Sequence, residues 1–136
     1  MQAGRVLETC LYVDDLPSAV AFYQDVLGLE AFSRVEGRHA FFRCGEGVLL
    51  LFDPAKTARA TGEVPAHGAY GPGHVAFAMR ISEQQAWREQ LGRAGVAIEA
   101  EITWPSGGQS LYFRDPAGNS VELTTPRTWG LAEDIR

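Results

Sequence analysis

The hydrophobic pattern in the first part of the chain changes between the periods of strands and helices. Apolar or β-branched side chains alternate at positions 7, 9, 11 and 13, which predicts a strand over residues 5–13. Residues 16–27 instead repeat apolar side chains every three or four positions, which predicts a helix with one buried stripe. Asp14 or Asp15 can cap this helix, and Gly28 ends it. Three short strand-like runs separated by glycine turns follow: 30–35, 39–43 and 48–52.

The same order of patterns then repeats in the second part of the chain. A strand at 73–80 precedes a helix that opens at Ser82 and closes at Gly95. Three more strands complete the repeat: 96–102, 109–114 and 120–124. Repetition at this scale indicates a duplicated supersecondary unit. The predicted fold class is therefore α+β, with two βαβββ modules forming curved mixed sheets around a cleft.

The two copies set the domain boundaries that we expect. Residues 1–136 form a single domain, with module one at about 5–53 and module two at about 72–126. The segment 54–71 has no clear period and is rich in Pro, Gly and Ala, so it is expected to be the linker between the modules.

Composition narrows the classes of partner. The 136 residues are 46% hydrophobic and 21% charged, as in an ordinary globular domain. The net charge of −5 and the scattered basic residues argue against a nucleic-acid or anionic membrane partner. No apolar run reaches the length of a membrane span. The two cysteines, Cys10 and Cys44, fit a reducing cytoplasm better than a disulfide framework.

Three potential metal ligands occupy related positions in the repeated pattern. Glu8 and His74 lie at matching places on the first strand of each module, and Glu122 lies on the last strand of module two. Strand alternation puts each of them on the face opposite the larger apolar set, so all three are expected to face the cleft. Each residue alone has a simpler explanation: a solvated Glu8, a core His74, or a Glu122 paired with Arg43 or Arg114.

Together, two carboxylates and a neutral imidazole would balance a divalent ion and leave positions open for substrate. The set favours Mn²⁺, Fe²⁺ or a similar ion such as Ni²⁺ over Cu²⁺, and Zn²⁺ remains an alternative. Glu8 and Glu122 are also the candidate catalytic groups, because a carboxylate that leaves the ion can act as a base.

Four further residues are candidate substrate contacts: Tyr112, Cys10, Trp104 and Ser110. Three of them also have a packing alternative, with Cys10 expected as a small buried filler and the aromatic residues as sheet core. His39 and His67 lie in turn or linker surroundings and are expected at the surface.

Several motifs, in order, resemble the modules of the vicinal oxygen chelate proteins, the superfamily of glyoxalases, bleomycin-resistance proteins and extradiol dioxygenases. Their spacing covers the chain from about Val6 to Pro126. The module-one motifs are residues 11–16, Ala21-Phe22-Tyr23 and Leu27-Gly28-Leu29. The module-two motifs are residues 73–77, 112–116 and 118–122.

The resemblance implies that Glu8, His74 and Glu122 are metal ligands. The fourth ligand position of the family falls on Leu50 or Leu51, which cannot coordinate, so a four-ligand glyoxalase I is disfavoured. A three-ligand site is more similar to the extradiol dioxygenases and the fosfomycin-resistance transferases. Because no lysine lies near Tyr112 and Ser110, we do not expect a fosfomycin enzyme. The family also implies a homodimer, in which Glu8 can come from one subunit and His74 and Glu122 from the other.

Two functions therefore compete. The first is a metal-dependent enzyme that acts on a small substrate with vicinal oxygens, by lyase, isomerase or dioxygenase chemistry. The alternative is a metal-free protein that sequesters a small aromatic or cationic compound in an acidic cleft, as bleomycin-resistance relatives do. Metal content separates the two hypotheses.

Overall fold

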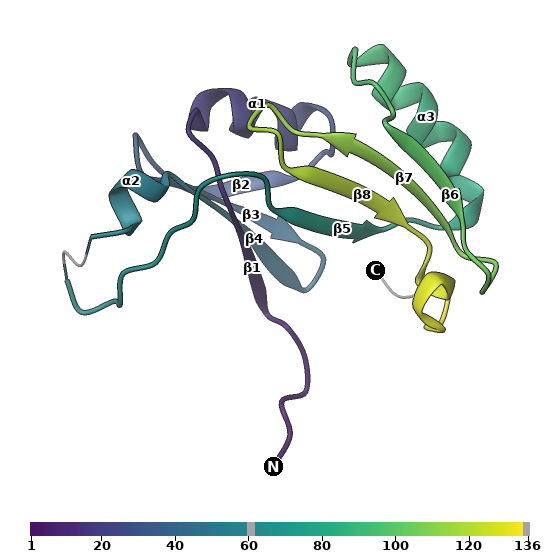
Figure 1. Ribbon diagram of the computed structural model, residues 1–136, viewed down its shortest axis with the longest axis horizontal. Coiled ribbons are helices and arrows are strands. Elements are labelled where there is room, and N and C mark those ends of the chain that lie inside the picture. Colours follow the sequence, from purple (N-terminus) through teal and green to yellow (C-terminus); the bar gives the residue numbers. More distant parts are fainter. Residues whose placement is uncertain (60–61, 135–136) are drawn as a thin grey trace. The chain divides into compact units, whose positions relative to one another are not determined.

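The structure is a computed structural model that describes residues 1–59 and 62–134. Contacts divide the chain into a first unit, Met1–Gly71, and a second unit, Pro72–Arg136. Each unit contains one four-stranded sheet with its own helices (Figure 1). Among the described helices, none combines the length and the apolar character that crossing a membrane requires.

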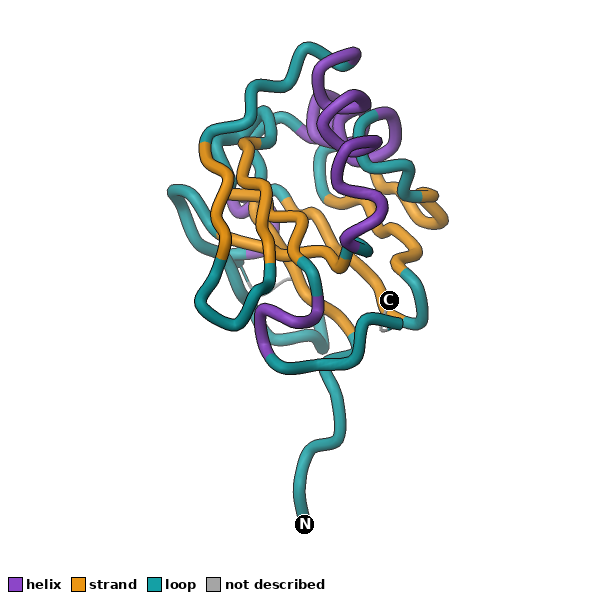
Figure 2. Tube along the Cα trace, turned by 90° about the vertical axis from the view of Figure 1, so that its right-hand side faces the viewer, coloured by secondary structure: helices purple, strands orange, loops and turns teal. Residues whose placement is uncertain are grey.

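The first unit has the predicted βαβββ order, and its sheet runs β1-β4-β3-β2. Strand β1 pairs with β4 in parallel, and the other neighbours pair antiparallel. In Figure 2 the residues that precede β1 form an extended loop that leaves the sheet. The elements are β1 (Glu8–Tyr12), α1 (Leu16–Asp25), β2 (Glu30–Val35), β3 (His39–Cys44), β4 (Gly47–Phe52) and the short α2 (Pro54–Thr57).

Helix α1 forms where the sequence predicts it, because its ends and its apolar stripe agree. The Asp15 carboxylate accepts the backbone N–H of Ser18 at 3.2 Å, which caps the first turn. Gly28 adopts a φ of 69°, a left-handed conformation that ends the helix at little cost. The stripe packs on one face of the sheet, with the rings of Tyr23 and Phe42 6.0 Å apart and both fully buried.

The second unit repeats this topology, with the strand order β5-β8-β7-β6. The turn at 115–119 is held by the Asp115 carboxylate, which accepts the backbone N–H groups of Ala117 and Asn119. The predicted α+β class with two βαβββ modules is thus confirmed. The elements are β5 (His74–Ala78), η1 (Ile81–Glu83), α3 (Gln84–Arg93), β6 (Ala100–Thr103), β7 (Gln109–Arg114), β8 (Ser120–Thr124) and η2 (Pro126–Trp129).

The largest differences from the prediction are the starts of two strands and a helix in the segment between the modules. Strand β1 begins at Glu8, so Leu7 precedes it and is 67% exposed. Strand β6 begins at Ala100, because the backbone N–H of Val96 donates to Leu91 O and belongs to the end of α3. A short helix, α2, lies in the segment that was expected to be linker, where the Asp53 side chain accepts the N–H of Ala55.

Candidate metal and substrate site

His74 and Glu122 lie together on one face of the second sheet. Strands β5 and β8 are parallel neighbours, and their register sets His74 opposite Ser120 and Ala76 opposite Glu122. The two side chains therefore point to the same side, and His74 Nε2 lies 3.3 Å from Glu122 Oε2. Glu122 is only 6% exposed, whereas His74 is exposed. This pair is the part of the predicted ligand set that a single unit assembles.

The hydrogen bonding of His74 determines whether its Nε2 can act as an acceptor or a metal ligand. Its Nδ1 lies 3.0 Å from the backbone carbonyl of Ser120. Since a carbonyl only accepts, Nδ1 must carry the proton. In a neutral imidazole the Nε2 lone pair then faces the Glu122 carboxylate. Two acceptors at this distance need a cation between them, either a proton or a metal ion.

Tyr112 adjoins this pair from the neighbouring strand β7. It lies opposite Glu122 in the β7–β8 register, and its hydroxyl hydrogen bonds to the Glu122 carboxylate. Burial raises the pKa of the Tyr112 phenol, and the bond to Glu122 raises it further. The ring also lies against His74, with centroids 6.3 Å apart. Tyr112 therefore orients the carboxylate, in addition to its predicted place at the substrate.

The other two candidates of the second unit bond to each other. The Trp104 indole N–H donates to Ser110 Oγ at 2.8 Å, and Ser110 Oγ lies 2.8 Å from the hydroxyl of Thr124. Ser110 is fully buried. The structure thus brings Trp104 and Ser110 together, and their contact with substrate remains a prediction.

Glu8 and Cys10 belong to the first unit, on β1. The sheet register settles which leucine corresponds to Glu122. Cys10 pairs with Leu50 as Ala76 pairs with Glu122, so Leu50 is the counterpart, and its side chain cannot coordinate a metal. Within residues 1–59 and 62–134, no three His, Cys, Asp or Glu side chains form a ready cluster for a metal ion.

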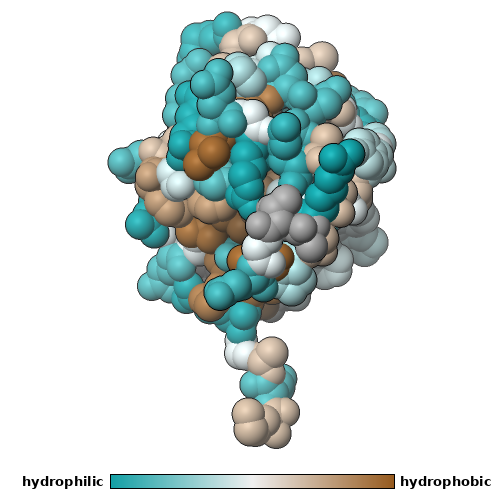
Figure 3. Space-filling model, turned by 90° about the vertical axis from the view of Figure 1, so that its left-hand side faces the viewer, coloured by the Kyte–Doolittle hydropathy of each residue, from teal (hydrophilic) through white to brown (hydrophobic). Residues whose placement is uncertain are grey.

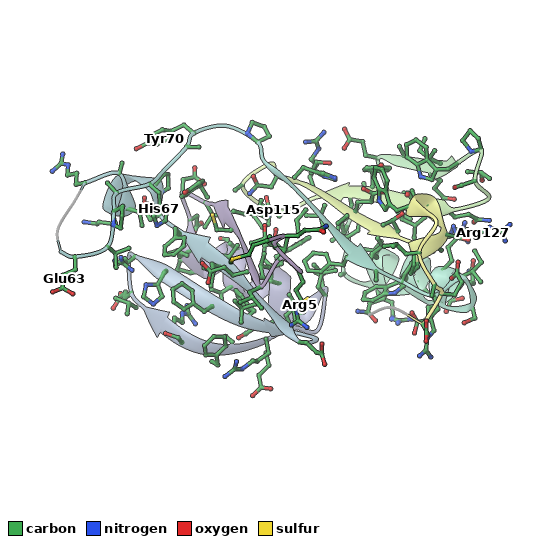
Figure 4. The ribbon with its side chains drawn as sticks, turned by 90° about the horizontal axis from the view of Figure 1, so that it is seen from below. Arg5, Glu63, His67, Tyr70, Asp115 and Arg127 are labelled. Atoms are coloured by element: carbon green, nitrogen blue, oxygen red, sulfur yellow. The ribbon has the colours of Figure 1, made fainter. Side chains whose placement is uncertain are left out.

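A cavity of about 650 Å³ lies within the first unit, a size typical of small-molecule sites. Glu8, Cys10 and Tyr12 contribute one wall from β1. His67, labelled in Figure 4, contributes from the segment after α2. Apolar surface also gathers in one area of the face shown in Figure 3, bordered by hydrophilic residues. The apolar wall of the cavity consists of Phe32, Phe41, Val48, Leu50, Phe52 and Val64.

Comparison with known proteins identifies the family. Residues 5–123 match the model of the Glyoxalase/Bleomycin resistance protein/Dioxygenase superfamily. The chain belongs to this superfamily. The resemblance found in the sequence motifs is thereby confirmed.

Its relatives within the superfamily include enzymes. A crystal structure of lactoylglutathione lyase from Agrobacterium tumefaciens is 42% identical, with a TM-score of 0.92 over 96% of this chain and 100% of that one. Glutathione transferase FosA of Serratia marcescens is 32% identical over 83% of this chain and 74% of its own length. The probable lactoylglutathione lyase of Vibrio parahaemolyticus is 26% identical over 90% and 91% of the two chains.

Three sequence-based expectations about this superfamily member were wrong, and one alternative that was considered for Glu122 is not observed. His39 is 9% exposed and stacks on Phe41 at 4.0 Å between ring centroids, so it is not a surface residue. His67 is half-buried and hydrogen bonds to the Tyr12 hydroxyl at 2.6 Å. Cys10 is exposed in the cavity rather than a buried filler. Glu122 pairs with neither arginine that was considered as its partner: the Arg114 guanidinium binds Glu99 and that of Arg43 lies over Phe32.

One signal in the sequence could have placed His39 correctly. In the strand predicted at 39–43, His39 and Phe41 are two residues apart and so point to the same face, and Phe41 lines the cavity. No comparable signal exists for His67, because its partner Tyr12 is distant in the chain.

Proposed function

We propose that the protein is a metal-dependent enzyme of the superfamily that acts on a small substrate with vicinal oxygens. The observation that carries the proposal is the His74–Glu122 pair, in which the imidazole Nε2 lies 3.3 Å from an oxygen of a buried carboxylate. A divalent ion satisfies both acceptors and neutralises the buried charge.

The donor atoms fit such an ion. His74 Nε2 and Glu122 Oε2 would hold it in the second unit, and Glu8 of the first unit is the proposed third ligand. One imidazole and two carboxylates suit Mn²⁺, Fe²⁺, Zn²⁺ or Ni²⁺. When bound, the ion would supply Lewis acidity toward the paired oxygens of a substrate.

The chain's own residues would supply orientation and proton transfer. The Tyr112 hydroxyl donates to Glu122 and holds the carboxylate in position. The Glu8 carboxylate is exposed and lines the cavity, where it can accept a proton from a substrate carbon next to a carbonyl.

The relatives support lyase or isomerase chemistry within this class, since two of them are described as lactoylglutathione lyases. Another is described as a glutathione transferase, FosA, which makes group transfer to a thiol a further candidate. The expectation against a fosfomycin substrate remains a prediction. Its stated reason still holds in the second unit, because the only lysine, Lys56, belongs to the first unit.

Calorimetric titration of chelator-treated protein with Mn²⁺, Fe²⁺, Zn²⁺ and Ni²⁺ tests the proposal. We expect at least one ion to bind far more tightly than about 1 mM, which corresponds to about −4 kcal/mol. His74→Ala should abolish this binding, whereas His67→Ala, which removes a histidine of the first unit, should not. Weaker binding of every ion, or equal binding by the His74→Ala protein, would refute the metal site.

A second candidate function is metal-free binding of a small molecule, which the aromatic wall of the cavity supports. Negative metal titrations together with ligand binding would favour it. The acidic cleft expected for this function is not what the cavity shows, because Arg38 lies in its wall along with Glu8. A cationic ligand is therefore no longer the natural choice.

We further propose a homodimer in a reducing compartment, consistent with two free cysteines. Sedimentation at micromolar concentration tests the dimer, and mixing inactive Glu8→Gln and His74→Ala proteins tests where the site forms. If each site takes Glu8 from one subunit and His74 from the other, random reassembly should restore about a quarter of the sites. If each site forms within one chain, the mixture should stay inactive.

A further inference from the structure

The cavity of the first unit has a chemical character beyond its proposed part in metal chemistry. We infer that it binds an elongated organic acid, with a flat apolar body against the phenylalanine wall and a carboxylate at Arg38. The inference rests on the proposed function in that the cavity is taken as the substrate pocket of the same site.

The apolar wall is built for a flat group. Phe41 and Phe52 meet edge to face, with ring centroids 5.5 Å apart, and His39 stacks on Phe41 with an interplanar angle of 8°. These rings come from the adjacent strands β3 and β4. Aromatic walls of this kind favour aromatic or similarly planar ligands, which they contact by stacking.

Arg38 supplies a positive charge that is held in place by its neighbours. Its Nη1 donates to His39 Nδ1 at 2.7 Å, and its guanidinium carbon lies 5.9 Å from the Phe52 ring centroid. Because His39 accepts this bond, it is neutral there and leaves the charge of Arg38 uncompensated. Among residues 1–59 and 62–134, no carboxylate lies within ion-pair distance of Arg38.

The surroundings of Arg38 reinforce this charge. A smaller adjoining cavity, of about 130 Å³, shares Arg38 and His67 with the large one and also includes Lys56 and Arg59. Its one acid is Glu63, which Figure 4 places at the outer tip of the segment, farther from the sheet than His67. Three cations against one carboxylate, in a chain of net charge −5, select an anionic group.

The polar ends of the large cavity are well separated. Glu8 and Tyr12 lie at opposite ends of β1, four residues and so about 13 Å apart. Tyr12 pairs with Phe52, which in turn pairs with His39, so the end with Arg38 is remote from Glu8. A ligand that spans the cavity would therefore present its reacting oxygens near Glu8 and its carboxylate near Arg38.

Binding of a matched pair of probes tests the inference. We expect 2-naphthoate to bind at least about tenfold more tightly than the neutral 2-naphthamide, equivalent to about 1.4 kcal/mol. Arg38→Gln should reduce this preference to nearly none, and Arg38→Lys should retain part of it. Arg34→Gln, which removes an exposed arginine of β2 outside the cavity wall, should retain it fully. The ratio is measured on each protein separately, so partial loss of folded protein does not affect it.

Equal binding of acid and amide to the wild type would overturn the inference, as would an unchanged preference in Arg38→Gln. Repeating the titration with chelator-treated His74→Ala separates the two proposals. If this variant still prefers the acid over the amide, the ligand carboxylate binds Arg38. If the preference disappears, the carboxylate binds the metal and the inference is refuted. If the acid binds while no divalent ion does, only the proposed metal function fails.

Discussion

The two units have the same topology and register but present different chemistry on one face of each sheet. The layer toward the helix is nearly identical in character: Phe42 and Phe113 are both fully buried, and Leu49 corresponds to Val121. On the other face, Leu50 stands where the second unit has Glu122. The comparison shows that one face of the strands specifies the fold and leaves the other free to differ.

The difference continues along the strands. Phe41 of the first unit corresponds to Tyr112 of the second, since each lies opposite the residue at the Leu50 or Glu122 position. His39 corresponds in the same way to Ser110. The first unit thus offers an aromatic wall with a cationic end, and the second offers the proposed metal ligands with a phenol beside them. The following predictions test this division of roles.

Removing the shared core should affect both units severely. We expect Phe42→Ala and Phe113→Ala each to lower the free energy of unfolding by about 3–5 kcal/mol, because each leaves a cavity in a fully buried layer. Denaturant unfolding measures the loss. Phe32→Ala, at a residue 44% exposed, is the control and should cost about 1 kcal/mol or less. A small loss at only one of the two core positions would show that the layers are not equivalent.

Giving the second unit the residue of the first should remove the metal. We expect Glu122→Leu to weaken the affinity for the preferred ion by at least about 100-fold, or about 2.7 kcal/mol. The reason is that the buried carboxylate beside His74 is lost. Titration calorimetry measures the change, and an affinity within threefold of wild type would rule out Glu122 as a ligand.

Removing the support of that carboxylate should have a smaller effect. Tyr112→Phe keeps the ring against His74 but loses the hydroxyl that bonds to Glu122. Loss of such an outer contact typically costs metal sites about tenfold or more in affinity, and we expect about tenfold here. Phe41→Tyr, the reverse change in the first unit, is the control and should leave the affinity unchanged.

Giving the first unit the acid of the second should raise the metal affinity rather than lower it. We expect Leu50→Glu to tighten metal binding by up to about tenfold, since the ligand gained is partly offset by the cost of burying a carboxylate. The added ligand should also occupy a substrate position and lower activity. Leu50→Gln is the matched control, because glutamine has the shape of glutamate but its amide is a weaker ligand. Equal metal affinities of the two variants would exclude coordination by residue 50.

The smallest expected effect concerns pH. Burial, and then the charge of Arg38, lower the pKa of His39 below its usual 6.5. As the pH falls below 6.5, His39 becomes protonated in the unfolded chain before it does in the folded protein. The free energy of unfolding therefore decreases between 6.5 and the lower pKa of the folded state. We expect the free energy of unfolding, measured by denaturant titration, to fall less between pH 7.5 and pH 5.5 in His39→Gln than in wild type. Ser110→Ala, at the corresponding position of the second unit, should leave the decline unchanged.

Local signals were sufficient for the fold and for part of the site. Short strand-like runs bounded by turn residues predicted β2, β7 and β8 with their observed ends, and the cap at Asp15 together with Gly28 predicted α1. Alternation also placed His74 and Glu122 on one face, and the structure brings them together. These predictions succeed because strand and helix periods depend on neighbouring residues alone.

What the sequence by itself determined is therefore the duplicated βαβββ topology, the superfamily, and the face on which each candidate ligand stands. Only the tertiary structure decided which groups complete the cavity of the first unit. Arg38 is poised by His39, and His67 reaches Tyr12 across 55 positions of the chain. Such contacts depend on strand register and on the path of the segment after α2. Neither leaves a periodic trace in the residues themselves, because these contacts join positions that are neighbours only after the chain has folded.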